Sequence, residues 1–273
     1  ENNISRKYHG YDIDLDKRIT ISTWQSLYKM PKKFFEDYGA VIGDEAHLFK
    51  AVSLTKIMTK LTDCKYRIGL TGTLDDSKTH KLVLQGLFGM VNKVVSTAEL
   101  IDRKQLANLK VVCLNLKYPE TESKKVKDVK YFEELEYITS SKPRNKYIRN
   151  LALALKGNTL LLFQLVEKHG EILFNLIKEK ADQKRKVFFV FGGTDTDDRE
   201  QIRAITERED NAIIVASYGT FSTGINIRNL HNIVFSSPTK SPIRVLQSIG
   251  RGLRVGDKKD SATVYDISDD LTY

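Results

Sequence analysis

Short apolar runs rich in β-branched residues alternate with amphipathic stretches along this chain, and this alternation restricts the possible folds more than any other feature. In the first part, residues 19–23, 39–43 and 66–70 have the length and composition of buried strands. Residues 53–61 and 77–87 have the apolar spacing of helices, and they lie between or after those strands. Strands separated by helices imply βα units and a mostly parallel sheet.

A second series of the same kind begins with a strong helix pattern at residues 142–155. Strand candidates follow at 159–163, 186–191, 211–216, 232–236 and 262–266, with helix candidates at 166–181, 196–207 and 242–249. We therefore predict an α/β fold with two doubly wound, parallel-sheet lobes, 1–99 and 142–273.

Residues 100–141 join the two series. They contain one alternating strand candidate, 109–117, and a Lys/Glu-rich stretch, 119–136. Two interpretations stay open for this segment: a connector or hinge between the lobes, or an edge strand followed by a solvated helix.

The chain has 273 residues, with 44 basic and 35 acidic side chains and a net charge of +9. This charge favours a polyanionic partner such as nucleic acid, and it is equally compatible with simple solubility. Cys64 and Cys113 belong to no Cys/His cluster, so we expect ordinary thiols in a reducing compartment. The apolar run 159–166 is too short to span a bilayer, and the polar start suggests no signal peptide, so we expect a cytoplasmic protein.

The run 40–45 is an apolar strand that ends in two acids, Asp44 and Glu45. Ligands bind at the carboxyl ends of strands in open α/β sheets. There Asp44 is suited to hold Mg²⁺ and Glu45 to orient or deprotonate an attacking water. The alternative is a solvated acidic pair without a ligand.

Two further strand ends carry hydroxyl groups. Thr71 and Thr73 follow one strand, where they suit hydrogen bonds to nearby polar groups or an ordinary turn and helix cap. Thr23, Trp24 and Gln25 follow another, where they suit contacts to the phosphates of a nucleic-acid strand. For Trp24 we favour a buried anchor over stacking on a base.

Residues 218–226 read as a loop dense in hydroxyl groups and glycine, with Gly224 and Asn226 at its end. Such a loop lets a phosphate or a nucleic-acid strand approach the backbone closely. The alternative is a polar turn with a helix cap at Thr220.

Gln247, Arg251 and Arg254 are spaced four and three residues apart, so on a helix they would share one face. Two guanidinium groups on one face favour an anion, and a γ-phosphate held by the opposite lobe would serve. The alternative is a pair of surface salt bridges. Gly250 and Gly252 favour close backbone approach over an ordinary helix face.

These motifs occur in the order found in superfamily 2 helicases and translocases of the DEAH-box-like kind, and the chain resembles that family over essentially its whole length. The residues that carry the resemblance are Thr23 to Gln25, Asp44-Glu45-Ala46-His47, Thr71-Gly72-Thr73, Ser222-Thr223-Gly224 and Gln247 to Arg254. Residues 215–219, 221–225 and 246–251 are similar to those of phage branch-migration helicases.

The resemblance implies two RecA-like lobes with ATP and Mg²⁺ between them. Asp44 would hold Mg²⁺, Glu45 would be the catalytic base, and His47 with Thr71 and Thr73 would link hydrolysis to movement. The resemblance also places Gln247, Gly224 and Asn226 near the nucleotide, and Arg251 and Arg254 at the γ-phosphate. The residues expected near nucleic acid are Thr23, Trp24, Gln25, Phe163, Gln164, Gly192 and Thr223.

The implied partner is branched or duplex DNA, or an RNA–DNA hybrid, handled by a monomer in recombination, repair or replication. The sequence departs from the family in lacking a G-x-x-x-x-G-K-[ST] phosphate loop. In the family this loop would precede Glu1, so we expect an incomplete first lobe, an exposed apolar sheet surface and poor ATP hydrolysis by this chain alone. A non-catalytic nucleic-acid-binding module derived from a helicase, or the motor subunit of a restriction nuclease, remain the alternatives.

Overall fold

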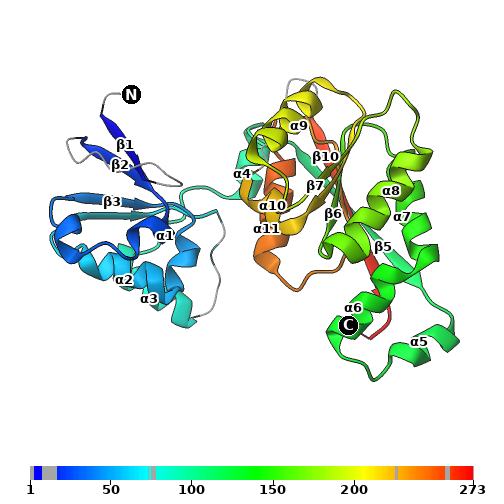
Figure 1. Cartoon of the computed structure of the whole chain (residues 1–273), viewed down its shortest axis with the longest axis horizontal. Coiled ribbons are helices and arrows are strands. Elements are labelled where there is room, and N and C mark those ends of the chain that lie inside the picture. Colours follow the sequence, from blue (N-terminus) through cyan, green and yellow to red (C-terminus); the bar gives the residue numbers. More distant parts are fainter. Residues whose placement is uncertain are drawn as a thin grey trace. The chain divides into compact units, whose positions relative to one another are not determined.

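The computed structural model describes residues 3–7, 17–72, 74, 78–224, 227–255 and 259–272. Its internal contacts divide the chain into two compact units, Glu1–Val94 and Val95–Tyr273, both drawn in Figure 1. Each unit has its own hydrophobic core. In the described part of the chain, no helix has the length and apolar character needed to cross a membrane.

The first unit contains two pairs of parallel strands. β1 (Ile4–Lys7) pairs with β2 (Ile19–Ser22), and β3 (Ala40–Gly43) pairs with β4 (Tyr66–Gly69). Its helices are α1 (Trp24–Leu27), α2 (Val52–Lys60) and α3 (Lys78–Phe88), with 3-10 turns at Lys32–Phe35 and Ala46–Lys50. The three strands and two helices predicted here are confirmed to within one residue at each end.

The β3–β4 pair is covered on one face and open on the other. On the covered face, Gly43 and Gly69 lie against the rings of Phe49 and Phe88, where an added Cβ would come within 2.8–2.9 Å of a ring carbon. On the open face, Ile42 is 66% exposed and Ile68, its partner in register, is 48% exposed. This is the exposed apolar sheet surface that the sequence predicts for the first lobe.

The second unit is built on a six-stranded sheet in which every pair of neighbours is parallel. The strand order is β5-β10-β9-β6-β8-β7. The strands are β5 (Asn108–Lys117), β6 (Thr159–Phe163), β7 (Val187–Val190), β8 (Ile213–Ser217), β9 (Asn232–Phe235) and β10 (Ser261–Asp270). The winding direction reverses beside β6, because β7 and β8 lie on one side of it and β9 and β10 on the other. Such a reversal is where open α/β sheets bind ligands.

Helices cover both faces of this sheet, as Figure 1 shows. α7 (Lys142–Ala154) and α8 (Glu171–Lys180) pack on one face, and α9 (Thr196–Arg208), α10 (Tyr218–Gly224) and α11 (Pro242–Gly252) supply the core of the other. A π-helical turn, Val166–Gly170, precedes α8. β6, β8 and β9 are therefore buried on both sides, and their sequences are continuously apolar rather than alternating.

The segment 100–141 belongs to the second unit, and the division of the chain falls between Val94 and Val95. β5 lies at the edge of the sheet and pairs with β10 along its whole length. α4 (Thr97–Asp102) precedes it, and α5 (Glu120–Val126) and α6 (Tyr131–Ser140) follow it. The structure matches the edge-strand interpretation, but α6 is not simply solvated, because Leu135 and Ile138 are buried.

The expectation of a loop at 218–224 is wrong, since these residues form α10. The side chains of Tyr218 and Phe221, one helical turn apart, are buried in the sheet core. Ser217 lies at the start of the helix, where its Oγ accepts the Thr220 N–H at 3.4 Å. Burial of two aromatic rings therefore outweighs the turn preference of the glycine and hydroxyl residues.

Candidate active site

Asp44 and Glu45 follow β3 at the carboxyl end of the strand. The Glu45 N–H donates to Asp44 Oδ1 at 2.9 Å, and the Glu45 backbone is left-handed, with φ of 48°. A non-glycine residue in this region is uncommon and costs roughly 1–3 kcal/mol. Asp44 is exposed, and the Glu45 side chain is 46% exposed. Both carboxylates are thus accessible at a strained turn, which is the kind of place where functional groups are found.

Backbone hydrogen bonds fix this turn against β4. Ala46 N donates to Leu70 O and Leu70 N donates to Gly43 O, each at 2.8 Å. The buried His47 ring then places its Nδ1 3.0 Å from Thr71 Oγ1 and 3.3 Å from Glu45 Oε2. The structure therefore brings Glu45, His47 and Thr71 into one group, whereas Thr73 lies outside the described residues.

Thr23, Trp24 and Gln25 begin α1, and all three are exposed. The Thr23 hydroxyl lies 3.2 Å from Ser26 Oγ. Trp24 is 41% exposed, so the favoured interpretation of a buried anchor is wrong. Exposure of this kind leaves stacking on a base open to Trp24.

Gln247 and Arg251 lie one helical turn apart on α11, and both are half-buried. Arg254 does not share their helical face, because α11 ends at Gly252 and Arg254 forms an antiparallel bridge with Leu106. The helix also runs through Gly250 and Gly252, contrary to expectation. The close approach predicted for this region is confirmed at Gly252, where a Cβ would lie 2.2 Å from Ile233 Cδ1 on β9.

Phe163 ends β6 with its side chain fully buried, stacked on Phe189 at a ring separation of 5.6 Å. The nucleic-acid contact expected of Phe163 is therefore wrong for its side chain, which fills the core instead. Gln164 is half-buried, and its N–H donates to Ser237 Oγ at 3.3 Å. Ser237 follows β9, so this bond joins the carboxyl ends of the two neighbouring strands at the reversal point.

The other residues expected near nucleic acid or nucleotide lie on separate elements. Gly192 follows β7, is exposed and accepts a hydrogen bond from Arg199 Nη2 at 3.0 Å through its carbonyl. Thr223 and Gly224 form the last turn of α10. Asn226 lies outside the described residues.

A buried ion pair supports the carboxyl ends of β9 and β10. Arg144 Nε and Nη2 donate to the two carboxylate oxygens of Asp269 at 2.8 and 2.9 Å, and Nη1 donates to Ser236 O at 2.8 Å. The two side chains are 1% and 5% exposed. Loss of one partner of such a pair costs about 3–5 kcal/mol.

His169 lies beside this pair and is fully buried. Its Nδ1 is 2.8 Å from Ser237 Oγ, and its Nε2 is 3.2 Å from Asn145 Oδ1. Burial lowers the pKa of His169 to about 3, and the positive charge of Arg144 acts in the same direction. A neutral imidazole is therefore a structural support for Ser237.

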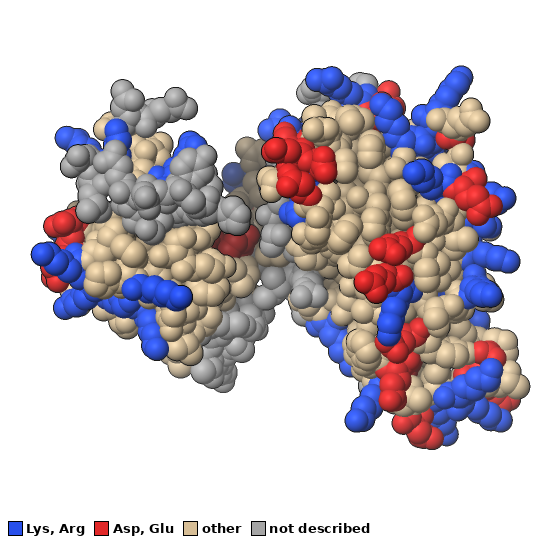
Figure 2. Space-filling view, viewed as in Figure 1, with Lys and Arg blue, Asp and Glu red and all other residues tan. Residues whose placement is uncertain are grey.

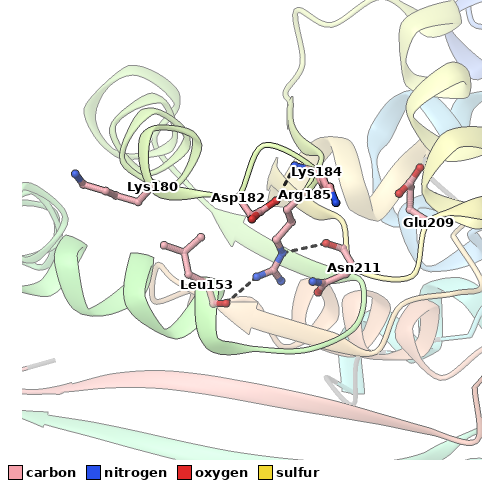
Figure 3. A pocket seen from close by; sticks show the side chains of 7 residues that line it. All are labelled: Leu153, Lys180, Asp182, Lys184, Arg185, Glu209 and Asn211. Carbon is pink, nitrogen blue, oxygen red and sulfur yellow. Dashed lines mark hydrogen bonds between the residues drawn. The ribbon is translucent and has the colours of Figure 1, made fainter.

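Among the described residues, neither the charge on the visible face of the second unit nor the pocket drawn in Figure 3 marks a second candidate site. On the visible face of the second unit, acidic side chains are interspersed with Lys and Arg, as Figure 2 shows. The pocket in Figure 3 lies at the amino ends of β7 and β8. Its central Arg185 donates to the carbonyls of Leu153, Leu155 and Asn211 at 2.7–2.9 Å, so it ties α7 to the sheet.

Two family models and a curated relative match this chain. Residues 143–256 match the helicase conserved C-terminal domain, and residues 1–76 match the type III restriction enzyme, res subunit. The ATP-dependent DNA helicase uvsW of Enterobacteria phage T4 is 39% identical over 257 residues, which cover 93% of this chain and 50% of that protein. The chain belongs to the superfamily 2 helicases and translocases.

Solved structures support the same fold. The crystal structure of T4 UvsW has a TM-score of 0.52 and 36% identity, covering 98% of this chain and 53% of that one. A fragment of a putative HsdR subunit of a type I restriction enzyme from Vibrio vulnificus YJ016 has a TM-score of 0.72 at 18% identity, covering 97% of this chain and 50% of that one. The chain thus spans about half the length of these relatives.

Several residues that support this candidate site lack a sequence signal. Ser237 bonds Gln164 and Lys259 bonds Arg228, both distant in sequence, and neither Ser237 nor Lys259 belongs to a motif. Arg144 and Asp269 are 125 residues apart. Leu106 pairs with Arg254 through a backbone bridge, which any residue can form. These supporting residues could have been found only with knowledge of which strands are neighbours in the sheet.

Proposed function

We propose that this chain is the motor part of an ATP-dependent DNA helicase or translocase. The observation that carries the proposal is the group at the end of β3. There accessible Asp44 and Glu45 precede a buried His47, whose ring contacts Thr71 just beyond the end of β4. Because His47 links the Glu45 carboxylate to a second strand end, a movement of Glu45 on nucleotide hydrolysis would be transmitted to the rest of the unit.

The residues at this strand end fit Mg²⁺, since exposed carboxylate oxygens are the ligands that this ion prefers. Bound Mg²⁺ would neutralise charge on the nucleotide phosphates. Asp44 is the residue that would hold the ion. Glu45 would accept a proton from the attacking water, and His47 would keep the Glu45 carboxylate in place.

Arg251 and Arg254 would contribute positive charge toward the γ-phosphate, and Gln247 would contact the nucleotide or the groups that link it to movement. A guanidinium in this role contributes on the order of 10³–10⁵ in rate. Arg251 lies on α11 and Arg254 in the segment beyond it, so the two would approach an anion from different backbone positions.

The proposed substrate is DNA, either branched or as an RNA–DNA hybrid, bound by a monomer in a host cytoplasm. The T4 relative, a DNA helicase, supports DNA over RNA. Exposed Trp24 beside Thr23 and Gln25 supports a contact to a single strand, because aromatic stacking suits any base. The likeness to the restriction-enzyme subunit shows only the fold, so it gives the alternative of a restriction motor no added weight.

The test is ATP turnover, with and without a branched DNA, by this chain and by the full translation product of its gene. We expect DNA-stimulated turnover by the full product, loss of that turnover in Glu45→Gln, and little turnover by this chain alone. DNA binding without turnover in the full product would instead support a non-catalytic binding module.

A further inference from the structure

Lys259 is a buried lysine that the proposed chemistry does not use. It is 3% exposed and lies just before β10. Its Nζ donates to the carbonyls of Gly252, of Arg254 at 3.2 Å and of Arg228 at 3.4 Å. One ammonium group therefore joins two backbone segments that are separate in sequence, residues 252–254 and Arg228.

Two of these carbonyls belong to the segment that carries the arginines. Gly252 is the last residue of α11, and the last carbonyls of a helix have no partner within the helix. A cation is also favoured at that end by the helix dipole. Lys259 thus acts as the cap of α11 and extends the cap to Arg254.

Other contacts fix the same segment independently of Lys259. Gly252 is pressed against Ile233, which sets the distance of the helix end from β9. Leu106 bridges Arg254, and Ala107 N donates to Leu253 O at 2.7 Å. These bonds come from the segment that follows the division between the two units. The placement of Arg251 and Arg254 therefore depends on a segment that is held both by Lys259 and by these contacts.

The third carbonyl links this segment to the end of the α9 helix. Arg228, whose carbonyl meets Lys259, donates its N–H to Glu207 Oε1 at 2.6 Å. Burial lowers the pKa of Lys259 to about 8, and the negative charge of Glu207 acts in the opposite direction. The ammonium is therefore the main form at neutral pH, although its burial is costly.

A purely structural role explains these contacts less well. An apolar side chain of similar length would fill the space without the cost of burying a charge, and such replacements are often neutral or stabilising. We propose that Lys259 is a positioning residue for the arginine pair, whose ammonium holds the end of α11 and residues 253–254 in the arrangement that directs Arg251 and Arg254 at the nucleotide phosphates. The inference rests on the proposed ATP-dependent function.

The test compares Lys259→Met and Lys259→Arg in the full-length protein. Lys259→Met keeps the apolar stem and removes the charge, and we expect kcat for DNA-stimulated ATP hydrolysis to fall about 100-fold, as for a misplaced catalytic group. We expect KM for ATP and the Kd for DNA to stay within about threefold, because the arginines act mainly on the transition state. Lys259→Arg should recover at least a tenth of the wild-type kcat.

Lys180→Met is the matched control, since Lys180 is an exposed lysine on α8 with its side chain 57% exposed. It should leave kcat unchanged. Amide hydrogen exchange supplies a readout without nucleotide: exchange at residues 250–254 should accelerate in Lys259→Met and not in the control. If Lys259→Met does not fold, Lys259→Gln, which keeps N–H donors, takes its place in both measurements.

A Lys259→Met protein with wild-type kcat, or with unchanged exchange at 250–254, would overturn this inference and leave the proposed function standing. A loss of kcat accompanied by an equal rise in KM would also overturn it, because a general loosening of the fold predicts that pattern. Absence of turnover in the wild-type full-length protein would instead reject the proposed function itself.

Discussion

His47 Nδ1 lies 3.0 Å from Thr71 Oγ1, and this contact joins the turn after β3 to the end of the neighbouring strand β4. The imidazole is buried and also lies 3.3 Å from Glu45 Oε2. A shift of the Thr71 backbone would therefore reach the Glu45 carboxylate through a single ring. Under the proposed function, this contact would give a physical route between a nucleotide bound at the end of β3 and a ligand beyond β4.

Thr71→Val removes this hydroxyl with almost no change in shape. We expect DNA stimulation of ATP hydrolysis to fall about tenfold, while turnover without DNA changes less, because the link to Glu45 is lost and the carboxylate remains. Thr59→Val is the control, since Thr59 is exposed on α2 and its hydroxyl donates to the nearby Lys56 carbonyl. Equal losses with and without DNA would contradict the linking role. The measurement is the steady-state rate of ATP hydrolysis, without DNA and at saturating DNA, for the wild type and both variants.

Arg251→Ala should lower kcat for ATP hydrolysis by about 10³–10⁵-fold, because it removes charge that stabilises the transferred phosphoryl group. DNA affinity should change by less than about threefold in a direct binding assay. Arg203→Ala on α9 is the control, since Arg203 forms an exposed pair with Glu200, one helical turn away. Turnover close to the wild-type rate in Arg251→Ala would show that this arginine has another role.

Gly252→Ala should destabilise the second unit by about 1–3 kcal/mol, because overpacking forces neighbouring side chains out of place. The added Cβ would lie 2.2 Å from Ile233 Cδ1. Ile233→Val removes that methyl group and should cost about 0.5–1.5 kcal/mol alone. In the double variant the two losses should not add, and urea denaturation of all four proteins measures the interaction. Strict additivity would mean that the helix end is not held against β9.

His169 should make the second unit less stable in acid. Its pKa is about 3 in the folded protein and near 6.5 when unfolded. Between these values the unfolded chain binds more protons, so the free energy of unfolding falls as pH drops from about 6.5 toward 3, and the contribution is fully present above 6.5. Urea midpoints measured from pH 7.5 to 4 should fall more steeply for the wild type than for His169→Gln. Parallel slopes would contradict the neutral buried imidazole.

The local sequence determined much of this protein, because apolar periodicity and strand-end chemistry act over a few residues. The strands of both units other than β1, and the helices α2, α3 and α7, follow from it. It also placed Asp44 and Glu45 at a strand end and Gln247 and Arg251 on one helix. The superfamily assignment follows from the order of these motifs.

Tertiary structure decided the rest, since it depends on contacts between distant segments. Residues 218–224, which read as a loop, form a helix because Tyr218 and Phe221 are buried. β5 belongs to the six-stranded sheet of the second unit because it pairs with β10. The side chain of Phe163 is buried in the core, whereas Trp24 is exposed. Arg254 does not lie on the helical face of Gln247 and Arg251. Gly252, at the end of α11, packs against Ile233, and Lys259 and Leu106 hold the segment beyond the helix. None of these outcomes is encoded in the spacing of neighbouring residues, because each is set by which strand or helix lies alongside.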